Sequence, residues 1–201
     1  MSINVCNNNS MSAITSLPSG VGGGALNLIS TQTASSSSTI SFTSGIDSTY
    51  KEYVFKFYDC HPATDNVDFQ VNFSSDSGSN YNVTKTTSFF AAYQNESGSA
   101  TSLTYANAND LEQSTGFQML NDGVGNGNDE SCVGTLHLFD PSNTTFVKHF
   151  IATSHRYYYS DYAIVDYMTG YCNTTSAIDA VQFKFESGNI DSGVIKLYGI
   201  S

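Results

Sequence analysis

The residue types that could carry out chemistry are present, but their spacing matches no known catalytic or metal-binding pattern. Among the four histidines, only His137 and His149 flank one predicted turn on neighbouring strands. A zinc site needs a third ligand at a defined spacing, and the chain contains neither HxH nor HExxH. Acidic pairs such as Asp161 and Asp166 are not set apart from the other acids, and G-x-S-x-G is absent. We therefore expect a non-enzymatic protein with no metal and no cofactor.

The four cysteines are far apart in the sequence. They are Cys6, Cys60, Cys132 and Cys172, and no pair forms C-x-x-C. The N-terminal residues show no basic region followed by an apolar one, so we expect no secretory signal. Free thiols are therefore favoured over a disulfide framework.

The most unusual segment is YYYSDYAIVDYMTGY, residues 157–171. Three successive tyrosines must place rings on both faces of a strand, and only one face can enter the core. Tyrosine is favoured at protein interfaces and also stacks on sugar rings, because it joins an apolar body to a polar tip. An interface, a sugar platform and an ordinary surface all remain open. The candidate partner or glycan surface consists of Tyr157, Tyr158, Tyr159, Tyr162 and Tyr167.

Charge and the length of the apolar runs exclude two classes of partner. The formal net charge is −11, and the seven basic residues are scattered singly along the chain. Nucleic-acid binding requires clustered lysine and arginine, so we expect none. No apolar run reaches the length of a membrane span, so we expect no membrane insertion.

The elements that must position these residues are β-strands. From residue 39 onward apolar residues alternate with polar ones, most clearly in VDFQVNF, where Val67, Phe69, Val71 and Phe73 share one face. About ten such segments are separated by turns rich in Gly, Asn, Ser and Asp. This pattern predicts an all-β antiparallel β-sandwich over residues 39–201, with jelly roll as the preferred topology.

Two hairpins and an arm are predicted in more detail. LHLFDPSNTTFVKHF predicts a hairpin whose turn begins at Asp140 and Pro141, and residues 180–201 predict a final hairpin. Residues 1–38 hold Gly20–Gly24 and Ser35–Ser38, a composition typical of a flexible N-terminal arm. Within the arm, the residues expected to bind a lattice are Leu26, Leu28 and Ile29.

Several phrases of this sequence resemble one protein family. They are GIDSTYKEYVFKFYDCHPATDNVDFQVNF, NESGSA, GTLHLFDPSNTTFVKHF and YCNTTSAIDAVQFKFESGNIDSGVIKLYGI, and they fall within residues 43–201. They resemble small structural proteins of marine tailed bacteriophages, including cyanophages. The resemblance implies a virion component with a β-sandwich or jelly-roll fold, often oligomeric, and supplies no catalytic residues.

These observations lead to two functional expectations. The first is a virion structural protein, a capsid decoration or cement subunit that binds the major capsid protein or other virion proteins. It would form a homo-oligomer, with a trimer preferred, and assemble in the host bacterial cytoplasm. The alternative is a receptor-binding module of a tail fibre or spike that recognises host surface polysaccharide.

Overall fold

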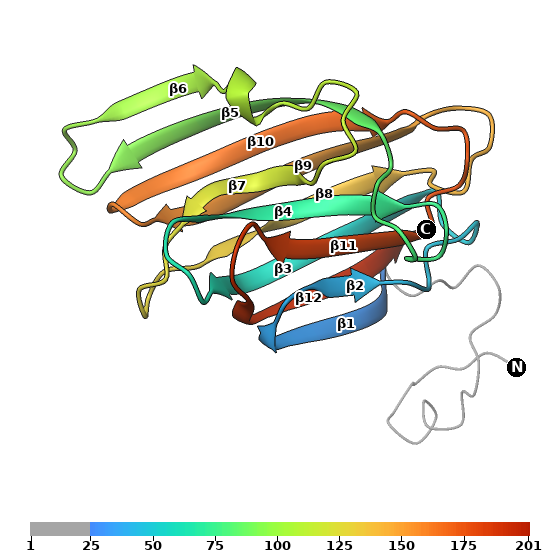
Figure 1. The fold of residues 1–201 in the computed structure, drawn as a ribbon, viewed down its shortest axis with the longest axis horizontal. Coiled ribbons are helices and arrows are strands. Elements are labelled where there is room, and N and C mark those ends of the chain that lie inside the picture. The colour runs from blue at the N-terminus through green and yellow to red at the C-terminus, as the bar shows by residue number, and fades with distance from the viewer. Residues whose placement is uncertain (1–24) are drawn as a thin grey trace, which may run out of the picture.

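The computed structural model describes residues 25–201, which form twelve β-strands and one short 3₁₀ helix (Figure 1). The three-residue helix is too short to cross a lipid bilayer. The elements are β1 (Leu26–Ser37), β2 (Ile40–Phe42), β3 (Glu52–Pro62), β4 (Val67–Ser74), β5 (Lys85–Asn95), β6 (Thr101–Tyr105), η1 (Asn107–Asn109), β7 (Gln118–Val124), β8 (Cys132–Phe139), β9 (Lys148–Tyr158), β10 (Tyr162–Cys172), β11 (Ala180–Phe185) and β12 (Ile190–Ile200).

All pairings between these strands are antiparallel, which confirms the all-β antiparallel part of the prediction. Nine strands follow one another in the order β1-β12-β3-β8-β9-β7-β4-β11-β2 and form a nearly closed, barrel-like sheet. Strand β9 is a branch point, because it pairs with β8, touches β7 through the single pair Val124–Tyr158, and also pairs with β10 along its whole length. Strands β10, β5 and β6 continue from β9 as a wing of the sheet (Figure 1).

Alternating side chains fill the interior as the sequence predicts. Val67, Phe69, Val71 and Phe73 are all buried, and so are the inward residues of β3 and β11. The ring of Phe183 lies at the centre of an aromatic cluster. Its centroid is 5.5 to 6.5 Å from those of Phe42, Phe55, Phe57 and Phe69. Edge-on and offset ring pairs of this kind add stability beyond the area that they bury.

The predicted arm is wrong for residues 26–37, because these residues form β1. This strand pairs with β12 from Leu26–Ile200 to Ser37–Ile190. Its composition concealed it, since Ala34 is its only buried hydrophobic side chain and most of the others are Ser, Thr and Gln. An edge strand needs backbone partners on one side only, so a strongly apolar face is not required. The remainder of the predicted arm, residues 1–24, lies outside the described residues.

The predicted final hairpin is also wrong, although its buried faces are correct. Strand β11 pairs with β4 and β2, whereas β12 pairs with β3 and β1. The link between them is held at the β3–β4 turn. Glu186 N donates to Asp68 O at 2.8 Å, and Ala63 N donates to Asn189 O at 3.0 Å. The four linking residues therefore carry the chain from one part of the sheet to another.

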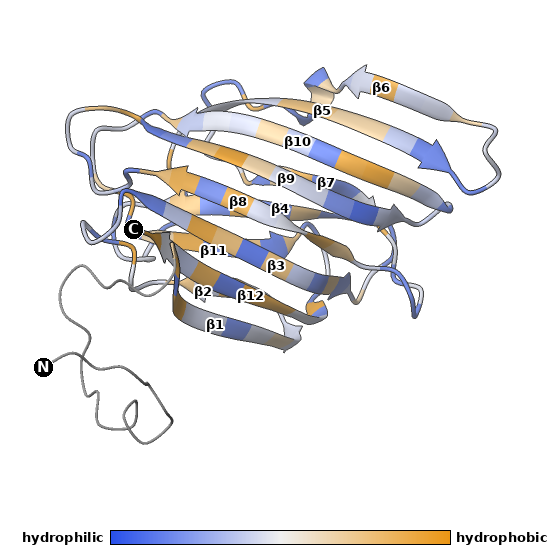
Figure 2. Ribbon diagram, turned by 180° about the vertical axis from the view of Figure 1, so that it is seen from behind, coloured by the Kyte–Doolittle hydropathy of each residue, from blue (hydrophilic) through white to orange (hydrophobic). Residues whose placement is uncertain are grey.

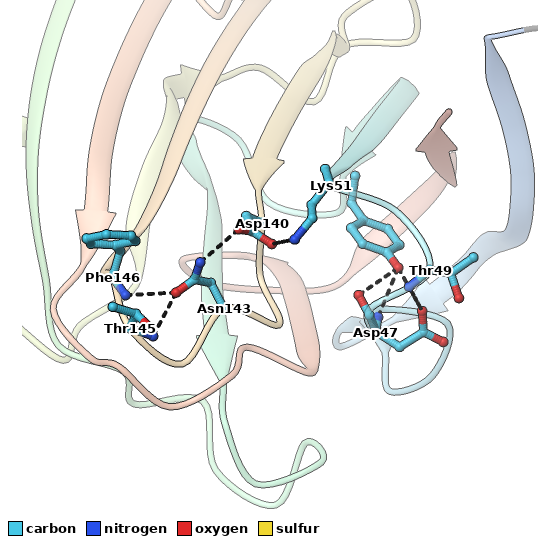
Figure 3. Close-up of polar contacts among 8 residues, drawn as sticks. Asp47, Thr49, Lys51, Asp140, Asn143, Thr145 and Phe146 are labelled. Carbon is cyan, nitrogen blue, oxygen red and sulfur yellow. Dashed lines mark hydrogen bonds and ion pairs between the residues drawn. The ribbon is translucent and has the colours of Figure 1, made fainter.

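The hairpin of β8 and β9 is confirmed, with Leu138 opposite Phe150. Its turn is closed by Asn143 N donating to Asp140 O at 3.0 Å, and Asn143 Oδ1 accepts from the backbone of Thr145 and Phe146 (Figure 3). Lys51 Nζ donates to Asp140 Oδ1 at 2.9 Å, which ties this turn to the start of β3. Hydrogen bonds from Asn143 and Lys51 lower the pKa of Asp140.

Candidate functional site

A cavity of about 510 Å³ opens where the wing meets the ends of β7 and β9. We call it the tyrosine cavity. Its apolar and aromatic lining consists of Phe89, Ala91, Tyr93, Tyr158, Tyr162 and Ile164. Its polar lining consists of Thr104, Asn109, Asp122, Arg156 and Ser160, with Ala106 completing the wall.

Strand register brings these residues together from distant parts of the sequence. Ile164 on β10 lies opposite Arg156 on β9 and opposite Tyr93 on β5. Two residues before Ile164 on β10, Tyr162 lies opposite Tyr158 on β9. Because side chains on neighbouring strands share a face when their residues are in register, this row faces the cavity as a group.

Three tyrosine rings form one corner of the cavity. The ring centroids of Tyr158 and Tyr162 are 5.9 Å apart with planes at 86°, and those of Tyr93 and Tyr162 are 5.6 Å apart at 75°. Such edge-to-face packing holds each ring at a fixed angle. The corner therefore presents a preformed aromatic surface with hydroxyl groups at its edges.

A buried polar network lies beneath the aromatic corner. Arg156 forms an ion pair with Asp166, and their side chains are only 4% and 0% exposed. Asn121 Nδ2 donates to Asp166 Oδ2 and to Ser154 Oγ, both at 2.9 Å. The guanidinium also lies over the ring of Tyr158, 5.6 Å from its centroid. We refer to Arg156, Asp166, Asn121 and Ser154 as the Arg156 network.

The Arg156 network is not fully satisfied by the protein. Among the described residues, Arg156 Nε, Asp166 Oδ1 and Asn121 Oδ1 are buried and have no hydrogen-bond partner. Buried polar atoms are costly to leave unpaired, and ordered water commonly satisfies them. Of the three residues, only Arg156 lines the cavity.

Burial dominates the electrostatics here. It raises the pKa of Asp166 to about 6, against the opposing effects of Arg156 and Asn121. Burial also raises the pKa of Asp68 to about 6, although Gly123 N donates to this carboxylate at 3.0 Å. The neighbouring carboxylate of Asp122, which lines the cavity, also acts to raise the pKa of both groups.

The five predicted tyrosines do not form one surface. Tyr158 and Tyr162 line the cavity, and Tyr159 packs against Tyr158 with ring centroids 4.4 Å apart. The hydroxyl group of Tyr157 donates a hydrogen bond to Glu96 Oε1 at 2.8 Å, and this contact is the main cause of the raised pKa of Tyr157. Tyr167 is on the opposite face of the sheet.

The sequence reading missed Tyr93, Asp122 and Arg156 as members of the site. Two signals were available: Phe89, Ala91 and Tyr93 alternate inward along one strand, and Arg156 is the only arginine in the chain. Neither signal identifies the partner strand, so the cavity itself could not be predicted.

Tyr167 belongs to a second feature, an exposed hydrophobic area on the other face of the wing. Tyr167, Phe90 and Tyr105 are adjacent in register across β10, β5 and β6, and the rings of Phe90 and Tyr167 stack with centroids 4.9 Å apart. Leu103 and Ile151 extend the area, and Leu103 is 74% exposed. We call these five residues the outer wing face, and hydrophobic segments along its strands are visible in Figure 2.

The other predicted residues lie elsewhere. Leu26 and Leu28 are exposed on the edge strand β1, while Ile29 packs against the core. His137 bonds to Glu52 at 2.6 Å, and Asp161 accepts a hydrogen bond from Tyr157. Within residues 25–201, no cluster of His, Cys, Asp and Glu is arranged to hold a metal ion.

Comparison with known proteins identifies no relative of the chain. No protein-family model, no curated protein and no solved structure matches the chain.

Proposed function

We propose that the chain is a non-enzymatic structural protein of a bacteriophage virion, acting as a capsid decoration or cement subunit. In this proposal the strands follow a jelly-roll path, and the subunit packs as a homo-oligomer, preferably a trimer, on the major capsid protein. The observation that carries the proposal is the outer wing face. It places five large hydrophobic side chains on adjacent strands in contact with solvent.

The physical reason is the cost of leaving that area uncovered. Contiguous exposed apolar areas on soluble proteins commonly mark sites of protein interaction. Phe90, Tyr105 and Tyr167 supply aromatic side chains, which are enriched at the centres of interfaces. The formal charge of −11 favours a basic partner surface and disfavours unspecific self-association. Such binding stabilises the assembled shell by mass action.

Replacing Leu103 with aspartate should release the protein from virions without unfolding it. The side chain is exposed in the monomer, so we expect the free energy of unfolding to change by no more than about 0.5 kcal/mol. We expect binding to capsids that lack the protein to fall at least tenfold, because the apolar contact of Leu103 is lost and a carboxylate must be desolvated in its place. Co-sedimentation with such capsids measures the binding.

Phe146→Asp is the matched control, because Phe146 is 67% exposed but lies in the turn between β8 and β9. Leu28→Asp tests attachment through β1. If only Leu28→Asp releases the protein, the outer wing face is not the attachment surface. Quantitative mass spectrometry of virions should also give a copy number for this protein that is a fixed ratio of the copy number of the major capsid protein. Absence from virions would overturn the proposal.

The tyrosine cavity favours a second candidate, a receptor-binding module of a tail fibre or spike that recognises host polysaccharide. Aromatic rings pack on the apolar face of a pyranose, and Arg156, whose Nε is unpaired, and the polar residues Asp122 and Ser160 of the lining can bond its hydroxyl groups. The cavity contains one arginine, already paired, and the carboxylate of Asp122. This balance favours neutral sugars over sialic or uronic acids.

Tyr162→Ala should weaken sugar binding about tenfold or more, since an aromatic contact of this kind contributes about 1.4 kcal/mol. The chain supplies a matched control in Tyr167→Ala, because Tyr167 is on the same strand and faces the other way. Isothermal titration calorimetry with host-polysaccharide fragments measures the affinity of both variants. Equal losses in the two variants, or no binding by the natural chain, would contradict this candidate.

A further inference from the structure

We propose that Cys60 and Cys132 are a preformed cross-strand pair that closes into a disulfide when the protein meets a thiol oxidant. The two residues are register partners on β3 and β8. Directly opposed residues of an antiparallel pair have Cα atoms about 4.5 to 5.5 Å apart. That separation falls within the range of about 4.4 to 6.8 Å that disulfides require.

The two side chains point to the same side of the sheet. Both residues are buried, and Cys132 Sγ lies 3.5 Å from the carbonyl oxygen of Cys60. The backbone of Gly193 lies against Cys60, and a Cβ at position 193 would come within 2.8 Å of the Cα of Cys60. Gly193 on β12 has a φ of +135°, and a Cβ placed there would come within 3.1 Å of Cys60 Sγ. A side chain at position 193 would therefore crowd the pair, and glycine avoids this.

A cavity lies next to the pair, although the two cysteines themselves are buried. A cavity of about 330 Å³ is lined by Asp59 and His61, which flank Cys60, and by Ser131, which precedes Cys132. Burial raises the pKa of Cys132, so little thiolate forms in the folded protein and direct exchange is slow. Oxidation is therefore expected mainly during folding or during local opening of β3 and β8.

The third described cysteine is not a competing partner. Cys172 lies on β10, in register with Lys85 on β5 and Lys148 on β9. All three described cysteines are buried free thiols, but Cys172 lies opposite Lys148 on β9, whereas Cys132 lies opposite Arg156, eight residues farther along that strand.

The reaction with oxidised glutathione balances in two exchanges. One cysteine, as a thiolate, attacks a glutathione sulfur and releases one glutathione thiol, which leaves a mixed disulfide. The second cysteine then attacks the protein sulfur of that mixed disulfide and releases the second glutathione. The protein loses two hydrogen atoms, and the oxidant gains them. The resulting link joins residues 72 positions apart, so it strongly restricts the unfolded chain.

The test is to refold the full chain with oxidised glutathione or with dithiothreitol, and to map the cysteines by mass spectrometry. We expect a Cys60–Cys132 disulfide only in the oxidised sample. We also expect its melting temperature to be higher by roughly 5 to 15 °C. Cys172→Ala should keep this difference, and Cys132→Ala should abolish it.

Three results would overturn the proposal. One is full alkylation of both cysteines after oxidation, and another is a dominant pairing with Cys6 or Cys172. The third is a disulfide that lowers the melting temperature, since that would show that the native strands must distort to form it. The mapping of the natural chain decides the pairing even if Cys132→Ala fails to fold.

Discussion

Replacing Arg156 with leucine is expected to lower the free energy of unfolding at pH 7 by about 3 to 5 kcal/mol. The variant leaves Asp166 fully buried, and within residues 25–201 Asn121 is then its only hydrogen-bond partner. A buried carboxylate without a positive partner is among the most destabilising changes that one substitution can produce. Urea unfolding at pH 7 measures the loss.

The pH dependence of the same variant distinguishes lost charge pairing from lost packing. Burial raises the pKa of Asp166 to about 6 in the folded protein, above the ordinary value of 3.8. The folded state therefore holds more protons than the unfolded state between about pH 4 and pH 6, and this carboxyl group favours folding at low pH. For the natural chain, Asp166 should add about 1 kcal/mol to stability on going from pH 7 to pH 5, and Asp68 should act in the same direction by less, because solvent screens its more exposed charge.

Without Arg156, the pKa of Asp166 should rise further, so the gain at pH 5 should be larger in Arg156→Leu than in the natural chain. The double variant Arg156→Leu/Asp166→Leu should recover most of the stability at pH 7, because neither charge is then buried. If the two substitutions are simply additive, the ion pair is not the cause of the loss.

The sequence predicted which side chains are buried far better than which strands are neighbours. Alternation placed Val67 to Phe73 and Val181 to Phe185 correctly, because a period of two is a local property of a strand facing one core. Partner choice is not local. Strands β11 and β12 look like a hairpin in sequence, yet backbone bonds at Ala63, Asp68 and Glu186 direct them to different neighbours.

The candidate site shows the same limit. Tyr158 and Tyr162 were foreseeable because a run of tyrosines cannot be buried on both faces of one strand. Tyr93 is 65 residues before Tyr158 in sequence, and only the register of β5, β10 and β9 brings them together. Arg156 was read as one of several scattered basic residues, whereas its burial beside Asp166 depends on β10 pairing with β9.

Ending the chain at Asn189 is expected to abolish cooperative folding. This truncation removes β12, which is the strand that joins β1 to β3. It also removes Ile190, Ile195 and Leu197, all fully buried. Each such side chain contributes about 2 to 5 kcal/mol. The sum is comparable to the whole stability of a typical domain, about 5 to 15 kcal/mol.

Removing β1 tests the corrected arm boundary and should have a smaller effect. A chain of residues 39–201 keeps every strand except β1, which buries one small side chain, Ala34, and packs Ile29 on the core. We therefore expect this chain to fold with a lower melting temperature than residues 25–201, measured by circular dichroism. Equal melting temperatures would show that β1 adds nothing to the barrel. For the chain that ends at Asn189, a single cooperative unfolding transition would contradict the prediction made for it. Such a result would show that the sheet folds without β12 between β1 and β3.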